Sequence, residues 1–282
     1  MLFFFVVSYV LGRALGYGSS LAGVMLIISG LMSFASYYYS DRIVLSMSGA
    51  HPADEKKHRD LIESVENLSI ASGLPKPKVY VVDDPAPNAF ATGRDPQHAA
   101  VVATTGILDK LSKSELEGVI GHELSHVKNF DTRLMGVVSI LAGSIVILSD
   151  FFMRSMLWGG IGGRDNRDRN SNSNGIFIII GLVAAVLAPI AATLIQLAIS
   201  RRREYLADAD GALLTRYPEG LARALEKIAG DRNVLKHASN ATAHLYIENP
   251  FKADSKKTSS FLTGLFSTHP PIEERIKLLR SM

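Results

Sequence analysis

Long apolar runs alternate with amphipathic segments along this chain of 282 residues. A run of about 20 uncharged residues matches the ~30 Å hydrocarbon core of a bilayer. The run at residues 19–40 has this length and ends in three tyrosines, which suit a membrane interface. Runs of similar character cover residues 1–12, 134–152 and 176–200, and the first is of marginal length. The pattern predicts two transmembrane helical hairpins.

The remaining segments have the periodicities of helices and short strands. Apolar residues recur at helical spacing in residues 61–70, 218–230 and 272–279, with proline or glycine near the ends of the first two. Three stretches between Pro, Gly and Asp turns predict strands at residues 78–82, 88–92 and 99–104. The predicted fold is therefore α+β and mainly α, with a small sheet.

A further helix is predicted around the H-E-x-x-H motif formed by His122, Glu123 and His126. Ser112 and Glu115, which precede the motif, have the spacing of a capping box. On a helix, the two histidines lie about 40° apart, so both imidazoles can reach one zinc ion. Glu123 can then lie beside the metal without binding it. The alternative is a pair of solvated helix histidines whose spacing arose by chance.

A catalytic zinc site has three protein ligands and one open position, so a third ligand is needed. The extended H-E-x-x-H-x-x-G-x-x-H pattern fails, because Asn129 and Thr132 replace its glycine and last histidine. Asp131 is too close along the helix to bind the same ion. The two apolar runs within residues 134–199 return the chain to its starting side, where Glu204 follows. Glu204 is the predicted ligand, and the alternative for it is a charge pair with the neighbouring arginines.

Asp208 lies one helical turn after Glu204 and so shares its face of a helix. A carboxylate there can accept a hydrogen bond from the ring N–H of a zinc-bound imidazole and fix its orientation. We expect Asp208 to support the zinc site in this way.

Composition excludes several other kinds of site. The mean hydropathy of +0.17 is high for a soluble protein, because the apolar residues are concentrated in the long runs. A net charge of +3 does not favour nucleic-acid binding. The absence of cysteine excludes disulfides, a thiol nucleophile and any Cys-ligated zinc site.

Four short motifs are distributed over the chain: Asn88-Ala-Phe-Ala-Thr-Gly93, Gly121-His-Glu-Leu-Ser-His126, Ser200-Arg-Arg-Arg-Glu-Tyr-Leu-Ala-Asp208 and Thr268-His-Pro-Pro271. Together they resemble the HtpX family of membrane zinc endopeptidases, which is related to the CAAX prenyl endopeptidases. The resemblance runs over nearly the whole chain. It implies a membrane-anchored fold of the gluzincin type, with His122, His126 and Glu204 as the ligands of one Zn²⁺ ion.

The resemblance also implies roles for residues beyond the zinc ligands. Asn88, Ala89 and Phe90 begin an exposed edge strand, to which an extended substrate adds through backbone hydrogen bonds. His269 and Arg275 resemble a pair beside the family's cleft, which makes His269 a candidate oxyanion stabiliser and Arg275 an electrostatic support. The alternative for the edge strand is an ordinary structural strand. The alternative for His269 is a histidine that caps the last helix.

The expected reaction is the hydrolysis of peptide bonds. Zinc would lower the pKa of a bound water molecule towards ~7, and Glu123 would take its proton and deliver it to the leaving amine. The resemblance suggests misfolded or damaged membrane proteins as substrates, in protein quality control. Two alternatives stay open: a CAAX-type prenyl-protein endopeptidase and a non-catalytic zinc-binding membrane scaffold. Glu123 favours an enzyme, since a scaffold needs only ligands.

These predictions divide the chain into an N-terminal transmembrane hairpin at residues 1–40, a first half of the protease domain at 41–133, a second hairpin at 134–199 and a second half of the protease domain at 200–282. Lys and Arg within about 20 positions of the apolar runs gather on the side of the protease segments. We therefore expect a multi-pass cell-membrane protein whose zinc site faces the cytoplasm. Its partners are then polypeptide substrates and the lipid bilayer, while the oligomeric state stays open.

Overall fold

The computed structural model describes residues 34, 37–138, 201–231, 233, 235, 247 and 270–282. None of the helices in these ranges combines the length and the apolar character that a bilayer crossing requires. The predicted spans at residues 1–12 and 176–200 lie outside the described residues, as do most of the runs at 19–40 and 134–152.

A small mixed sheet forms one layer of the described fold. Its strands are β1 (His51–Pro52), β2 (Lys78–Val82), β3 (Ala89–Thr92) and β4 (Ala100–Thr104), in the order β1-β2-β4-β3. β2 runs parallel to β4, whereas β1 pairs antiparallel with β2 and β3 pairs antiparallel with β4. The three predicted strands are confirmed. β1 is an addition, because a His-Pro dipeptide has no strand pattern of its own.

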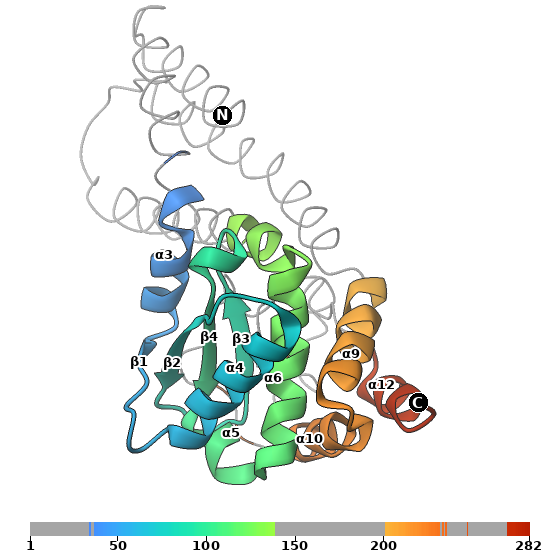
Figure 1. Cartoon of the computed structure of the whole chain (residues 1–282). Helices are drawn as coiled ribbons and strands as arrows, with labels where there is room; N and C mark the ends of the chain where they lie inside the picture. The colour runs from blue at the N-terminus through green and yellow to red at the C-terminus, as the bar shows by residue number, and fades with distance from the viewer. Residues whose placement is uncertain are drawn as a thin grey trace, which may run out of the picture.

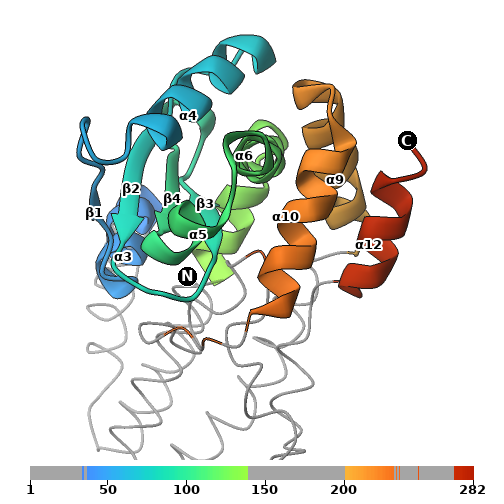
Figure 2. The same ribbon diagram turned by 90° about the horizontal axis from the view of Figure 1, so that it is seen from below.

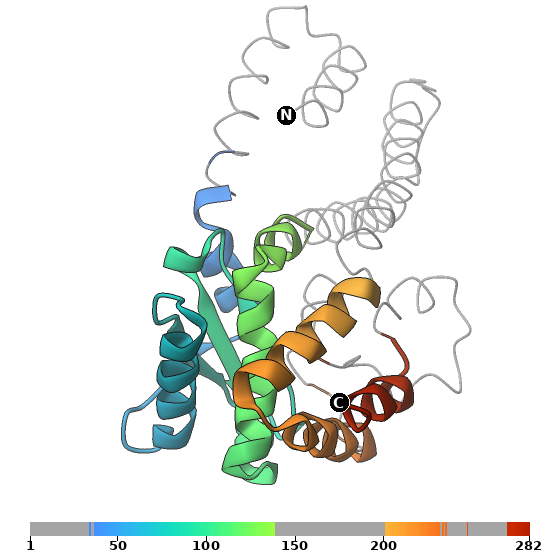
Figure 3. The ribbon, with the colours of Figure 1, turned by 45° about the vertical axis from the view of Figure 1, so that its right-hand side comes forward.

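Helices pack around the sheet and extend the fold beyond it (Figure 1 and Figure 3). They are α3 (Ser40–Met47), α4 (Arg59–Ser72), α5 (Thr105–Lys110), α6 (Lys113–Lys128), α9 (Arg201–Thr215), α10 (Pro218–Gly230) and α12 (Ile272–Leu279), with a 3-10 turn at Pro96–His98. The three amphipathic segments form α4, α10 and α12, and the H-E-x-x-H motif lies on α6. The prediction of a mainly helical α+β fold is therefore confirmed.

α6 lies at the centre of the described fold. Figure 2 shows it almost end-on, between α4 and the sheet on one side and α9 and α10 on the other. Its Leu124 belongs to one hydrophobic cluster with Leu61, Val101, Leu221 and Leu279. Because this cluster draws on residues before 139 and after 200, the two parts of the described chain share a core.

Glycines let α6 approach its neighbours at backbone distance. A Cβ added to Gly118 would lie 2.6 Å from the backbone nitrogen of Leu221 in α10. One added to Gly211 of α9 would lie 2.8 Å from the backbone nitrogen of His122. Any larger residue at these positions would overpack the contact and push the helices apart. The glycine contact with α9 therefore sets how closely Glu204, on the same helix, approaches the two histidines.

Candidate metal centre

α6 begins with the predicted capping box. The backbone N–H of Ser112 donates to the Glu115 carboxylate at 2.8 Å, and Lys227 of α10 donates to the same oxygen at 2.6 Å. Burial would raise the pKa of Glu115, but the hydrogen bonds from Lys227 and Ser112 outweigh burial and lower it. The ionised carboxylate thus fixes the first turn of the helix that carries the H-E-x-x-H motif.

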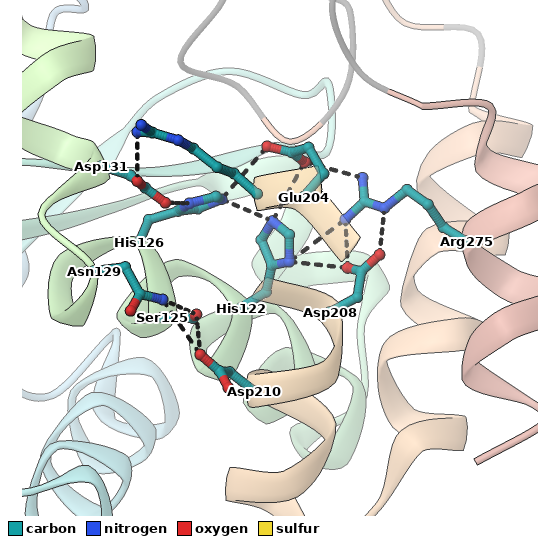
Figure 4. Close-up of polar contacts among 10 residues, drawn as sticks. His122, Ser125, His126, Asn129, Asp131, Glu204, Asp208, Asp210 and Arg275 are labelled. Carbon is teal, nitrogen blue, oxygen red and sulfur yellow. Dashed lines mark hydrogen bonds and ion pairs between the residues drawn. The ribbon is translucent and has the colours of Figure 1, made fainter. Parts of the chain in front are cut away.

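Three side chains from two helices converge on one point (Figure 4). His122 Nε2 and His126 Nε2 lie 3.2 Å apart. Glu204 of α9 places one carboxylate oxygen 3.7 Å from His122 Nε2 and the other 3.6 Å from His126 Nε2. All three residues are buried, with exposures of 1%, 4% and 1%. The alternative of a solvated histidine pair is therefore wrong, and Glu204 lies with both histidines rather than on the surface.

The donor set fits a zinc ion. Two imidazoles and one carboxylate form a ligand set of catalytic zinc sites, in which the fourth position is left to water or substrate. One ligand atom from each of the three residues lies within 4.8 Å of the others. Both histidines turn Nε2 toward this point and Nδ1 toward a second carboxylate, which is the usual support of a zinc-bound imidazole.

Asp208 holds His122 as predicted. Its Oδ1 lies 2.9 Å from His122 Nδ1, and Arg275 of α12 donates to its two oxygens from Nε at 2.8 Å and Nη2 at 2.7 Å. Arg275 Nη1 also lies 3.7 Å from the Glu204 carboxylate. Burial would raise the pKa of Asp208, but Arg275 and His122 outweigh it and lower the pKa to about 2. Asp208 is therefore ionised and accepts the ring N–H.

Asp131 holds His126 in the same way. Its Oδ2 lies 3.1 Å from His126 Nδ1, and its Oδ1 accepts a hydrogen bond from Arg203 Nη1 at 2.7 Å. Burial would lower the pKa of His126, but the hydrogen bond with Asp131 and the Glu204 charge outweigh it and raise the pKa to about 9. The sequence excluded Asp131 as a ligand and predicted no other role for it. Its contact with His126 could not be predicted from helical spacing, because the helix is interrupted at Phe130, where φ is 59°.

Glu123 lies beside this centre and is 3% exposed. Its carboxylate lies near the backbone N–H of Ala91 in β3, which helps to lower its pKa. Burial raises the pKa of Glu123, while the neighbouring charges of His122 and His126 oppose that shift. The carboxylate next to the zinc ligands thus faces the sheet, against which α6 packs.

β3 is the edge strand of the described sheet, as predicted, but its exposure was predicted wrongly. Residues 88–92, backbone included, are each less than 5% exposed. The reason is that α6 packs over β3, while Phe90 on the other face joins a second hydrophobic cluster.

The backbone of β3 turns alternate groups outward. Asn88 accepts the N–H of Thr104 in the next strand at 2.9 Å, so Asn88 faces β4. Because outward and inward residues alternate in an antiparallel pair, the backbone groups of Ala89 and Ala91 point away from β4. The carbonyl of Ala89 accepts the N–H of Ile247 at 3.2 Å. The chain's own backbone thus already forms one hydrogen bond at this edge.

The family model for peptidase family M48 matches residues 55–282. The chain belongs to peptidase family M48. The protease HtpX homologue of Caldanaerobacter subterraneus subsp. tengcongensis is 51% identical over 252 residues, which cover 89% of this chain and 81% of the relative. That of Streptococcus gordonii is 42% identical over 284 residues, which cover 99% and 94%. The resemblance to the HtpX family is therefore confirmed.

As an M48 peptidase, the chain is a zinc metalloprotease that acts on polypeptides, and His122, His126 and Glu204 form its zinc site. Among solved structures, Ste24p of S. mikatae has a similar fold, with a TM-score of 0.51 and 18% sequence identity. The similarity covers 98% of this chain and 61% of Ste24p. At this level of identity the similarity concerns the fold alone.

Two further site residues were predicted for this M48 peptidase, Arg275 and His269. Arg275 is fully buried at the zinc site, where it holds Asp208, a contact that the sequence did not predict. His269 lies outside the described residues.

A separate polar network of the M48 peptidase joins α6 to α9 (Figure 4). Ser125 Oγ donates to the Asp210 carboxylate at 2.9 Å, and Asn129 Nδ2 lies 3.1 Å from Ser125 Oγ and 3.3 Å from the carboxylate. Ser125 and Asp210 also line a cavity of about 240 Å³, whose walls include none of the three zinc ligands. The network therefore braces the two ligand-bearing helices, and the cavity is distinct from the metal centre.

Proposed function

We propose that this M48 zinc metalloprotease is an endopeptidase in which Glu123 is the general base. The observation that carries the proposal is the place of Glu123. It follows the zinc ligand His122 in sequence, and its buried carboxylate lies near the backbone N–H of Ala91 in β3, which helps to lower its pKa. A base at this position lies next to the metal and to a peptide bound along β3.

Zinc, when bound, polarises the scissile carbonyl and lowers the pKa of water. Glu123 takes a proton from the attacking water on its carboxylate and passes that proton to the nitrogen of the leaving amine. Burial raises the pKa of Glu123, which favours its holding the proton between these two transfers. The peptide C–N bond breaks as the amine leaves with the proton.

The substrate binds as an added strand along β3, through the outward backbone groups of Ala89 and Ala91 rather than those of Asn88 and Phe90. This is supported by the outward carbonyl of Ala89, which already accepts a backbone N–H from Ile247. A substrate strand would replace that bond. Peptide substrates with single amides changed to esters test the arrangement, since losses in kcat/KM should recur at every second position. An even loss at all positions would argue against strand addition.

The residues around the ligands have supporting roles in this proposal. Asp208 orients His122, and Arg275 holds Asp208 and adds positive charge near Glu204. His269 stabilises the developing oxyanion, a role that follows from the resemblance of the Thr268–Pro271 motif to that of the HtpX family.

The peptidase is anchored in the cell membrane by the hairpins at residues 1–40 and 134–199, with the halves at 41–133 and 200–282 on the cytoplasmic side. The apolar runs and the distribution of Lys and Arg support this organisation. Misfolded or damaged membrane proteins are the substrates in this proposal, which assigns the enzyme to protein quality control.

Cysteine labelling tests the orientation, because the chain contains no native cysteine. A cysteine introduced at Ser171, in the loop between the two later runs, should react with an impermeant thiol reagent outside intact cells. One introduced at Ser255 should not. The reverse pattern would show that the zinc site faces outward.

The activity is tested with full-length protein in detergent, with casein and a membrane protein as substrates. We expect cleavage at internal peptide bonds, its loss with a chelator and its return with zinc. Cleavage restricted to prenylated CAAX peptides would favour the prenyl-protein endopeptidase. Stoichiometric zinc without any cleavage would favour the scaffold, although membership of a peptidase family already favours the enzyme.

A further inference from the structure

Each of the two zinc histidines contacts an aspartate, which in turn contacts an arginine (Figure 4). His122 contacts Asp208, which contacts Arg275. His126 contacts Asp131, which contacts Arg203 of α9. Arg203 Nη1 donates to Asp131 Oδ1 at 2.7 Å. Of these contacts, only the support of a zinc-bound imidazole by Asp208 was predicted from the sequence.

We infer that Asp131 and Arg203 are positioning residues for the zinc ligand His126. A zinc-binding Nε2 leaves the proton of the neutral ring on Nδ1, which lies 3.1 Å from Asp131 Oδ2. Asp131 therefore selects the tautomer and the ring orientation that present Nε2 to the metal. Arg203 uses the other carboxylate oxygen, so Asp131 is held from both sides. The inference rests on the zinc centre and is independent of the proposed role of Glu123.

The two positioning residues are far apart in the sequence, one before and one after residues 139–200. Asp131 follows the end of α6, and Arg203 lies in the first turn of α9, so residues 139–200 separate the segments that meet at His126. Asp131 is 4% exposed, whereas the Arg203 side chain is 39% exposed. Water can partly replace Arg203 but not Asp131, so the loss of Asp131 should have the larger effect.

Zinc affinity of the full-length protein in detergent tests the inference, by competition with a chromophoric chelator. Asp131→Ala should weaken zinc binding by about 10- to 100-fold, the range found for such supporting partners. Arg203→Gln should weaken it by a smaller factor, about three- to tenfold. The double variant should bind zinc within about twofold of Asp131→Ala, because the two side chains act through one contact.

Two controls separate positioning from folding. Asp210→Ala removes a carboxylate that also braces α6 against α9 but contacts Ser125 and Asn129 instead of a ligand, so it should lower Tm without weakening zinc binding. Arg202→Gln removes an exposed neighbour of Arg203 and should change neither quantity. Arg203→Gln keeps the test decisive if Asp131→Ala fails to fold, because Arg203 is partly exposed. Two results would overturn the inference. One is a zinc affinity within threefold of the wild type in Arg203→Gln and in any folded Asp131→Ala protein. The other is that the losses of zinc affinity in the double variant are additive.

Discussion

Gly211 of α9 lies directly against the backbone of His122 in α6. A Cβ at Gly211 would lie 2.8 Å from the His122 nitrogen and 3.2 Å from its Cα. Because Glu204 and Asp208 lie on the same helix as Gly211, this contact fixes the distance between the two helices that supply the zinc ligands. The zinc site therefore depends on a residue that has no side chain.

Gly211→Ala should push α9 away from α6 and weaken zinc binding. We expect overpacking to cost about 1–3 kcal/mol of folding stability, together with a loss of zinc affinity. Thermal unfolding and chelator competition measure the two effects. Gly230→Ala is the matched control, since a Cβ there meets nothing within 4 Å. Equal zinc affinity in the two variants would show that the site does not need this close approach.

Much of the centre could be predicted because its information is local. The i, i+4 spacing of His122 and His126 places both rings on one helix face wherever the helix packs. The ends of α10 were also predicted as found, since Pro218 favours the first helical position and Gly230 a helix end. Glu204 was predicted because two apolar runs lie between it and His126, which would return the chain to the same side.

The missed features depend on how distant segments meet. Asp131 reaches His126 through the reversal at Phe130, and Arg275 reaches Asp208 only because α12 packs against α9. The burial of β3 likewise depends on α6, which covers it. One signal was present for Gly211: a glycine within a helix costs about 1 kcal/mol relative to alanine, so it indicates close packing.

Arg275→Met should destabilise the protein strongly. The substitution leaves the buried Asp208 carboxylate without its two guanidinium hydrogen bonds, a loss that typically costs about 3–5 kcal/mol. Denaturant unfolding of the zinc-free protein measures it. Arg280→Met on the same helix removes an arginine whose pairs with Glu219 and Glu226 are exposed, so its midpoint should barely move. Similar midpoints for both variants would contradict the structural role of Arg275.

Glu204→Ala should lose zinc as well as proteolysis, because it removes one of three ligands. The zinc content after dialysis should fall well below one ion per chain. Glu226→Ala, which removes a glutamate on α10 that pairs with Arg280, serves as the control and should retain zinc. Full zinc occupancy at unchanged affinity in Glu204→Ala would mean that another residue is the third ligand.

Zinc binding should become tighter as the pH rises. In the absence of metal, burial lowers the pKa of His126, but Asp131 and Glu204 outweigh burial and raise it to about 9. Zinc must displace this proton, so the apparent affinity should rise by about tenfold per pH unit below pH 9 and level off above it. Calorimetry in buffers of different ionisation enthalpy should show proton release at pH 8. Binding that is independent of pH between 7 and 8.5 would contradict the assignment.

The comparison of Glu123→Gln with the wild type tests the central claim most directly. The substitution keeps the size of the side chain and all three zinc ligands but removes the proposed base. The measurement is casein cleavage by full-length protein, with the zinc content determined on the same sample. We predict about one zinc ion per chain and a loss of kcat of at least about 100-fold, the usual contribution of a general base. Cleavage within tenfold of the wild type, at equal zinc content, would contradict the account.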